Sequence, residues 1–311
     1  MSHSDSPDVH PPGIEVRDLT VRYGDKVAVD GLDLHLTGGK IHGLLGRNGS
    51  GKTSLLSVIA AFRRATSGQV TVGGRPVFEA PDVVADICFI RGSGDTVTND
   101  WPDDKVKHAL GFAATVRPRW DATLADALVE RFALPLDTRL GELSRGQRSA
   151  LGITLGLASR APVTIFDESY LGMDAPSRYA FYDVLLADVT EHPRTVVIST
   201  HHIEEVARVF EQVAIIDDGR LVLQGDADDL RGEGATVTGA AEAVEDFTAG
   251  REVLATRHLG PTRSATVFGA LTADERRHAT QMGLEVGPVP LQDLFVHLTE
   301  PTRVAARNGS L

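Results

Sequence analysis

The residue types that point most directly to chemistry stand between positions 46 and 53, in the stretch GRNGSGKT. Glycine, lysine and threonine fill every fixed position of the pattern G-x-x-x-x-G-K-[ST]. Glycines let backbone N–H groups wrap a polyphosphate, Lys52 would reach the terminal phosphates, and the Thr53 hydroxyl would bind Mg²⁺. The stretch therefore predicts a nucleotide site. A plain strand–turn–helix with a surface lysine is the structural alternative.

The flanking residues predict the elements that hold this loop. Ile41, Leu44 and Leu45 indicate a buried strand leading in, and the stretch from Thr53 to Ala60 indicates a helix leading out. Further along, APVTIFDE and TVVISTH are apolar runs without polar alternation. Such runs are typical of strands buried on both faces of a parallel sheet.

Other segments predict smaller parts of the fold. Residues 14–40 alternate apolar and polar positions and predict antiparallel strands, with another strand pair near 68–78. Residues 103–117 and 123–133 have the apolar spacing of helices. VAIIDDGRLVLQG predicts a hairpin that turns at Asp-Gly.

The two ends of the chain have a different character. Residues 1–13 predict a frayed, disordered tail without the charged and apolar leader of a secretion signal. After Arg231, the glycine- and alanine-rich GEGATVTGAAEA predicts a linker. The rest predicts a small strand-and-helix unit that ends in the helix LQDLFVHL.

Composition limits the class of protein. The chain has 311 residues with 42% hydrophobic residues, enough for one large domain and a smaller one. A net charge of −12 argues against a nucleic-acid-binding body. The single cysteine fits a reducing compartment, and no apolar run approaches the length of a membrane span. We therefore expect a cytoplasmic protein.

A second motif narrows the class. Leu143, Ser144, Arg145, Gly146 and Gln147 resemble the LSGGQ signature of the ATP-binding-cassette (ABC) ATPases. Ser144 and Gly146 would open a helix whose amino end offers a hydroxyl and bare N–H groups to a phosphate. The resemblance implies that these five residues close over the ATP of a second subunit. An ordinary N-capped helix is the alternative.

Further motifs follow in the order that this family has. Asp167 and Glu168 end an apolar run, as the Walker B acids do; the resemblance implies that Asp167 serves Mg²⁺ and that Glu168 is the general base. A pair of solvated acids at a strand end is the alternative. Asp174 falls at the acid that contacts the dimer partner, and His201 at the histidine that contacts the γ-phosphate. His202 is interpreted as a surface neighbour.

An aromatic residue upstream completes the implied site. Tyr23 stands where the family stacks a ring on adenine, and Ala28 would pack nearby. The resemblance implies Thr53 and Asp167 as metal ligands, and Glu168 and His201 as catalytic residues. The implied ATP contacts are Tyr23, Ala28, Gly46, Arg47, Asn48, Gly49, Ser50, Gly51, Lys52, Thr53 and Ser54.

The implied fold is α/β, namely a P-loop ABC ATPase domain. It would combine a mainly parallel core sheet, an antiparallel N-terminal β subdomain and a helical subdomain that carries the signature. The expected boundaries are 14–231 for this domain, about 92–160 for the helical subdomain, and 232–311 for a linker and a small C-terminal accessory domain.

The pattern departs from the family in one place. The glutamine that usually touches Mg²⁺ and water is replaced, in ICFIRGSGDT, by Gly92. Either Ser93 or Asp95 substitutes through a shifted loop, or water completes the coordination. If the carboxamide is missing, Gly92→Gln should raise ATP turnover. Ser169 also replaces the usual proline after Glu168.

The resemblance implies an ATP-binding and ATP-hydrolysing transporter subunit with ATP and Mg²⁺ as cofactors. Its partners would be a second ATP-binding subunit, in a homo- or heterodimer, and a separate transmembrane permease that holds it at the inner face of the membrane. The C-terminal LQDLFVHLT resembles the ends of exporter cassettes, which favours export over import. Two alternatives remain: a soluble ABC ATPase acting on nucleic acid or the ribosome, and a regulatory subunit with little turnover.

Overall fold

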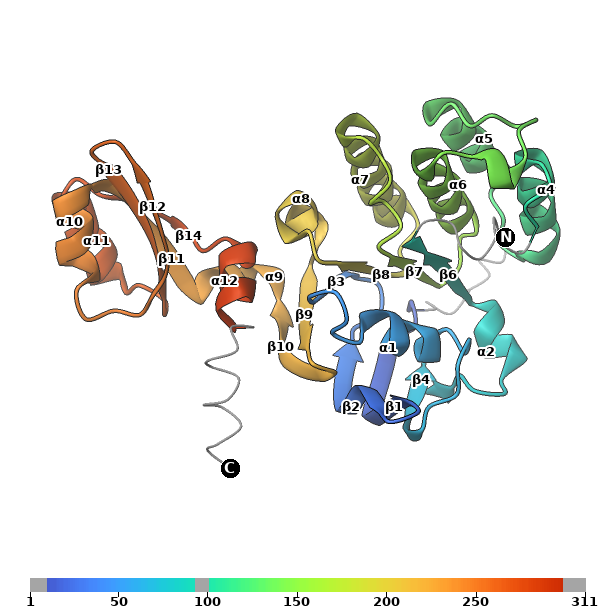
Figure 1. Cartoon of the computed structure of the whole chain (residues 1–311), viewed down its shortest axis with the longest axis horizontal. Coiled ribbons are helices and arrows are strands. Elements are labelled where there is room, and N and C mark those ends of the chain that lie inside the picture. The colour runs from blue at the N-terminus through green and yellow to red at the C-terminus, as the bar shows by residue number, and fades with distance from the viewer. Residues whose placement is uncertain (1–9, 93–100, 299–311) are drawn as a thin grey trace, which may run out of the picture. The chain divides into compact units, whose positions relative to one another are not determined.

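The computed structural model describes residues 10–92 and 101–298 of the chain (Figure 1). Two compact units divide it: Met1–His201 with Ile216–Leu221, and His202–Ile215 with Val222–Leu311. Ser93 and Asp95, the proposed substitutes for the missing glutamine, lie outside the described residues.

An antiparallel sheet forms from the alternating segment that follows residue 13. Ile14 on its first strand lies opposite Leu36 on one side and Val72 on the other. Buried apolar residues of these strands alternate with more exposed polar residues, as expected for a sheet with one solvated face. The prediction of antiparallel strands is confirmed. In the order β2-β1-β4-β5, the strands are β1 (Ile14–Tyr23), β2 (Lys26–Leu36), β4 (Ser67–Val72) and β5 (Arg75–Pro76).

The residues just before this sheet are held in place. Thr195 Oγ1 donates a hydrogen bond of 2.7 Å to the carbonyl of Pro12, and the Gly73 N–H donates to the carbonyl of Gly13. The prediction of a frayed tail is therefore wrong for these residues, because backbone carbonyls find partners that the sequence pattern cannot show. Residues 1–9 of that tail lie outside the described residues.

The core sheet carries the apolar runs that bracket the loop. Strands β3, β8, β7 and β6 are mutually parallel, so their carboxyl ends meet at one edge. In this register Asp167 lies opposite Ser199 on one side and Arg91 on the other. Cys88 is buried on β6. In the order β10-β9-β3-β8-β7-β6, the strands are β3 (Ile41–Leu45), β6 (Ile87–Arg91), β7 (Val163–Asp167), β8 (Thr195–Thr200), β9 (Gln212–Asp217) and β10 (Arg220–Asp226).

The first of the two units also contains helices, and Figure 1 shows α4, α5 and α6 gathered together. The predicted helices near 103–117 and 123–133 are confirmed as α4 and α5. The helices are α1 (Lys52–Ile59), α2 (Pro81–Ala85), α4 (Val106–Val116), α5 (Ala122–Arg131), the short 3₁₀ turn η2 (Leu140–Glu142), α6 (Arg145–Ala158) and α7 (Ala175–Glu191).

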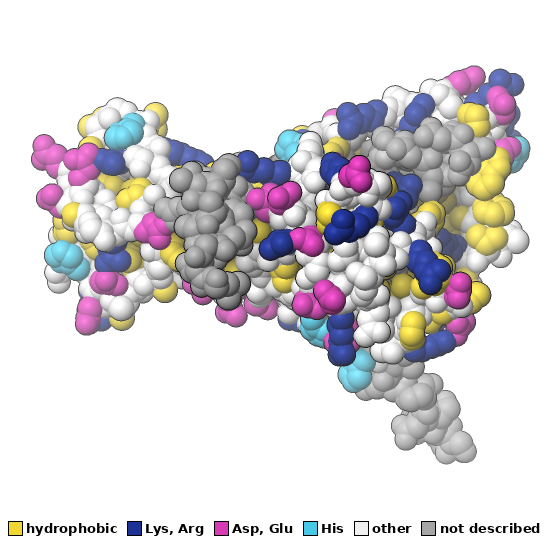
Figure 2. All heavy atoms as spheres, turned by 60° about the horizontal axis from the view of Figure 1, so that its bottom comes forward, with side chains coloured by type: hydrophobic (Ala, Val, Ile, Leu, Met, Phe, Trp, Pro, Cys, Tyr) yellow, Lys and Arg dark blue, Asp and Glu magenta, His cyan; other side chains and the backbone are white. Residues whose placement is uncertain are grey.

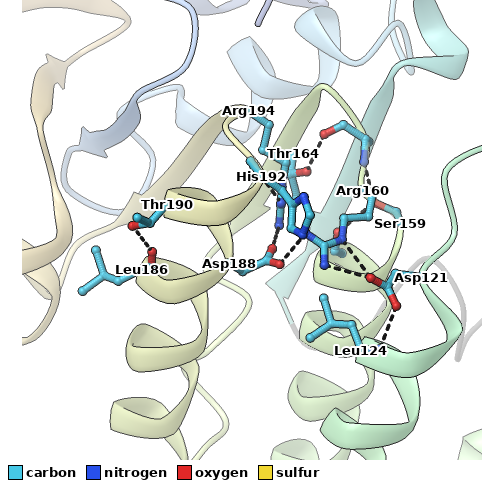
Figure 3. Close-up of polar contacts among 12 residues, drawn as sticks. Asp121, Leu124, Ser159, Arg160, Thr164, Leu186, Asp188, Thr190, His192 and Arg194 are labelled. Carbon is cyan, nitrogen blue, oxygen red and sulfur yellow. Dashed lines mark hydrogen bonds and ion pairs between the residues drawn. The ribbon is translucent and has the colours of Figure 1, made fainter. Parts of the chain in front are cut away.

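A row of alternating charges ties the carboxyl end of α6 to its neighbours (Figure 3). The Arg160 guanidinium lies 2.8 Å from Asp121 Oδ2 and 2.6 Å from Asp188 Oδ1, and Arg194 pairs with the same Asp188 carboxylate. Asp188 and Arg194 are almost fully buried. Removing one member would leave a buried charge without compensation, which is strongly destabilising. The row therefore fixes one end of α6 to α5, α7 and the start of β8.

The C-terminal unit has its own sheet, built from the pattern β-α-β-β-α-β in the strand order β12-β13-β11-β14. Buried apolar residues of β11, α10, β13 and α11 form its core. Its elements are α8 (Ile203–Val206), η3 (Ala207–Val209), α9 (Ala227–Gly232), β11 (Gly234–Ala240), α10 (Ala241–Thr248), β12 (Val253–Leu259), β13 (Thr262–Phe268), α11 (Ala273–Gln281), β14 (Glu285–Pro288) and α12 (Leu291–Leu298).

The linker predicted after Arg231 is wrong. Its residues form β11, which pairs with β13 and β14, and the helix α10. Ala235 and Val237 of β11 are fully buried. This glycine- and alanine-rich sequence has little local preference for the β conformation, and it forms a strand because distant segments pair with it.

Candidate functional site

The glycine-rich loop lies between β3 and α1, and the side chain of its lysine is buried within the loop. Lys52 is only 5% exposed, and its Nζ donates to the carbonyls of Gly46 and Arg47 at 2.8 and 3.0 Å. Burial lowers the pKa of Lys52 below its ordinary value. An ammonium group with little contact to water interacts strongly with any anion that enters the loop.

Glycine is required where the loop becomes a helix. Gly51 has φ of 103°, and a Cβ there would lie 2.3 Å from the carbonyl oxygen of Ala28. The loop can therefore pack directly against β2, and the first N–H groups of α1 face the loop. A helix amino end of this kind favours negative charge.

A pocket of about 310 Å³ opens at this helix end. Asn48, Gly49, Gly51, Lys52, Thr53 and Ser54 line it together with Tyr23, Lys26, Ala28 and Glu168. The structure thus brings the predicted loop residues together with the predicted Tyr23 and Ala28. The other three predicted loop residues, Gly46, Arg47 and Ser50, do not line this pocket; Gly46 and Ser50 pack against each other, and Arg47 is exposed.

The first acid of the predicted pair is buried against the loop. Asp167 is 4% exposed, and it accepts a hydrogen bond of 2.8 Å from Thr53 Oγ1 and another from the Ser199 hydroxyl. Burial raises the pKa of Asp167. Sequence reasoning missed Ser199, although its place opposite Asp167 follows from the parallel register.

These oxygens suit a hard divalent cation. The Thr53 hydroxyl and the Asp167 carboxylate lie side by side, and a bound cation would offset the desolvation of this buried carboxylate. Among the described residues no cluster of three or more histidine, cysteine or acidic side chains could hold a metal. Mg²⁺ fits this sparse donor set, because it keeps several waters and takes phosphate oxygens as ligands.

The second acid faces the pocket. Glu168 Oε1 lies 2.9 Å from His201 Nδ1 and 3.7 Å from Lys52 Nζ. Its backbone N–H donates to Ser199 Oγ, and its φ of 51° is uncommon for a residue with a side chain. Such strain is typical of functional sites. Glu168, His201 and Lys52 therefore form a connected group, whereas His202 is exposed.

Beside this group lies a second pocket of about 430 Å³, lined by Arg91, Gly92 and Arg145 together with Asp167 and Glu168. Arg91 Nη2 lies 3.3 Å from Ser57 Oγ, one helix turn after Thr53. Sequence reasoning did not single out Arg91, although it directly precedes Gly92. The guanidinium of the residue before Gly92 therefore lines the pocket beside the two acids.

Gly92 itself leaves little room for a side chain. A Cβ there would lie 3.0 Å from the carbonyl oxygen of Asp167 and 3.1 Å from that of Glu168. Ser169, which replaces the usual proline, donates from its hydroxyl to the carbonyl of Ile90 at 2.8 Å. The backbone after β6 and the backbone after β7 are thus in direct contact.

The signature segment opens α6 as predicted. The Ser144 hydroxyl accepts from the Gln147 N–H, and the Gln147 side chain accepts from the Ser144 N–H, which is a complete capping box. Neither Ser144 nor Gly146 lines the two pockets described above, and Leu143 is buried. Arg145 differs from them, because it lines the second pocket of its own chain.

Asp174 has a local role in this structure. It caps α7, accepting a hydrogen bond of 3.0 Å from the Ser177 N–H, and hydrogen bonds from the Ser177 side chain and then from its backbone lower the pKa of Asp174. The predicted contact of Asp174 with a second subunit stays a prediction.

The chain is similar to several known proteins. The family described as "ABC transporter" matches residues 29–170. The ABC transporter ATP-binding protein YtrB of Bacillus subtilis is 29% identical over 71% of this chain and 74% of its own length. The Nod factor export ATP-binding protein I of Burkholderia orbicola is 30% identical over 68% of this chain and 70% of its own length. The solved structure of an ATP-binding subunit of an ABC transporter superposes with a TM-score of 0.62 at 20% identity, over 70% of this chain and 91% of that one.

Proposed function

Because the chain belongs to the family of ABC transporter ATP-binding proteins, we propose that its loop pocket holds Mg²⁺-ATP and that hydrolysis there drives a separate membrane partner. The chain is an ATP hydrolase of the ABC type. One observation carries the assignment of the site: Lys52, Glu168 and His201 meet within hydrogen-bonding or ion-pair distance beside the phosphate loop.

The geometry suggests a role for each side chain. Lys52 and the amino end of α1 hold the phosphates, and Glu168 accepts the proton of the water that attacks the γ-phosphate. His201 Nδ1 orients the Glu168 carboxylate. Bound Mg²⁺, held by Thr53 and Asp167, supplies electrostatic stabilisation of charge on the phosphate oxygens.

The signature residues serve the nucleotide of a second subunit in this proposal. Ser144 and Gly146 sit at a helix amino end and line neither pocket of their own chain. Asp174 would contact the same partner. Closure of two subunits around two ATP molecules, and their reopening after hydrolysis, would then move the membrane partner.

Mixing two inactive variants tests these composite sites. Ser144→Arg blocks the signature, Lys52→Ala empties the phosphate loop, and neither variant alone should turn over ATP. An equal mixture should regain about a quarter of the parent ATPase rate, because half the dimers are mixed and each has one intact site. A mixture of Lys52→Ala with Glu168→Gln is the control and should stay inactive. An inactive first mixture of correctly folded dimers would contradict the proposal.

Gly92 gives a further prediction. The close approach of two carbonyls argues against the expectation from the sequence, because a Cβ at this position would lie 3.0 Å from the Asp167 oxygen and 3.1 Å from the Glu168 oxygen. Gly92→Ala and Gly92→Gln should both lower the steady-state ATPase rate severalfold, since a displacement of catalytic groups by a fraction of an ångström is costly. A faster Gly92→Gln beside a slower Gly92→Ala would instead show that a carboxamide is missing.

The membrane partner and the location belong to the same proposal. Among the described residues, no helix combines the length and the apolar character that crossing a membrane requires. We propose a cytoplasmic subunit bound to the inner face of the membrane through a permease. The match to a Nod factor export protein supports export over import.

The alternative functions are less well supported. The relatives described above are named as transporter or export ATP-binding proteins. On the face drawn in Figure 2, lysine and arginine side chains are interspersed with aspartate and glutamate, which does not favour a nucleic-acid-binding stripe. Co-purification with a multispan membrane protein that stimulates the ATPase would support the transport role.

A further inference from the structure

A cation is stacked on the ring that the proposal assigns to the nucleobase. The guanidinium carbon of Arg63 lies 3.8 Å from the centroid of the Tyr23 ring. Tyr23 is 45% exposed and lines the loop pocket, whereas Arg63 does not line it. Arg63 therefore covers the ring face that is turned away from the pocket, and the other face is left for a ligand.

Two further contacts fix Arg63 between β1 and α1. Its backbone N–H donates to the carbonyl of Ser57 near the end of α1. Its Nη2 donates 2.9 Å to the carbonyl of Arg22, the residue before Tyr23. Nε of Arg63 is buried and makes no hydrogen bond within the described residues. The guanidinium is thus partly desolvated, which strengthens its attraction to an aromatic face.

The tyrosine ring is held to α1 at a second point. Ser54 Oγ donates to the Tyr23 hydroxyl at 3.3 Å. Ser54 lies on α1, which starts at the phosphate loop, and Arg63 is hydrogen-bonded to Ser57 of the same helix, so both residues hold the ring against α1. A base stacked on this ring would therefore be positioned relative to the phosphate loop through α1.

We propose that Arg63 is a positioning residue for the nucleobase: it holds Tyr23 by a cation–π contact so that the free ring face stacks on a purine. This inference rests on the proposed ATP function. A guanidinium behind the ring also withdraws electron density from it, which favours stacking on an electron-rich base.

The experiment compares a ligand that has a base with one that lacks it. Dissociation constants of Mg²⁺-ATP and of inorganic tripolyphosphate are measured for the full chain and for Arg63→Ala and Arg63→Lys. Arg63→Ala should weaken ATP binding about threefold to tenfold, raise KM with kcat unchanged, and leave tripolyphosphate binding at the parent value. Arg63→Lys, which keeps a cation, should recover part of the loss.

A matched control lies one residue further on. The Arg64 guanidinium stacks on Phe78, outside the pocket, at 5.2 Å, so Arg64→Ala should bind ATP as the parent does. Tyr23→Ala should lose ATP affinity, and adding Arg63→Ala to it should cost nothing more, because the two residues act as one unit. Thermal melting checks that each variant is folded.

The outcomes distinguish a failure of the proposed base site from a failure of the role proposed for Arg63. If Tyr23→Ala binds ATP normally, the proposed base site falls. If Tyr23→Ala is weakened but Arg63→Ala matches Arg64→Ala, the inference about Arg63 falls and the base site stands. Equal losses of ATP and tripolyphosphate in Arg63→Ala would also overturn the inference, since they would place its effect at the phosphate loop.

Discussion

Glu168→Gln is expected to abolish ATP turnover while ATP still binds. The carboxylate faces the pocket 3.7 Å from Lys52 Nζ and is held by His201. Glutamine keeps the shape and the contact with Lys52 but cannot take a proton from water. Loss of a general base lowers turnover by about 10²- to 10⁴-fold. Steady-state phosphate release and equilibrium ATP binding measure the two effects separately.

Glu191→Gln is the matched control, since it makes the same chemical change at an exposed position at the end of α7. It should hydrolyse ATP at the parent rate. The Glu168→Gln protein should also accumulate as an ATP-bound dimer, because the step that reopens it is blocked. Turnover by Glu168→Gln at the parent rate would remove Glu168 from its role.

Lys52→Ala is expected to lose ATP binding itself. Its ammonium group is buried in the loop, so its attraction to phosphate is little screened by water. Each charge-assisted hydrogen bond contributes about 1.5–3 kcal/mol, and two of them would lower the affinity on the order of 100-fold or more. Titration with a fluorescent ATP analogue measures the loss.

Lys107→Ala provides the comparison for this variant. Lys107 lies exposed on α4 and pairs with Asp137 at the surface. Surface ion pairs contribute little to stability, so this variant should bind ATP as the parent does. A Lys52→Ala protein that binds ATP normally would place the phosphates elsewhere.

The parts of the site that could be predicted from the sequence are short motifs, in which a few adjacent residues determine both the local structure and the chemistry. The loop between β3 and α1, the acids after β7 and the cap of α6 each depend on a few adjacent residues. Their order along the chain resembles that of one family, and the resemblance implied the roles of these residues. It implied the fold class as well.

The parts that the sequence did not reveal depend on contacts between distant segments. Ser199 meets Asp167 through strand register, and Arg63 meets Tyr23 because the segment after α1 returns to β1. The strand β11 has little apolar character of its own and owes its place to pairing with β13. No local pattern in a single sequence marks such contacts.

The single thiol on β6 gives this protein a built-in reporter of its own opening. Cys88 is buried, so a thiol-reactive dye reaches it only in molecules whose core sheet has separated. When opening is rapid and reversible, the rate of labelling is proportional to the fraction of molecules that are open. ATP at a hundredfold excess over its dissociation constant should slow labelling about a hundredfold, because ligand binding withdraws molecules from the open state. Nucleotide affinity can thus be obtained from the labelling rate of the native thiol, without introducing a probe into the site.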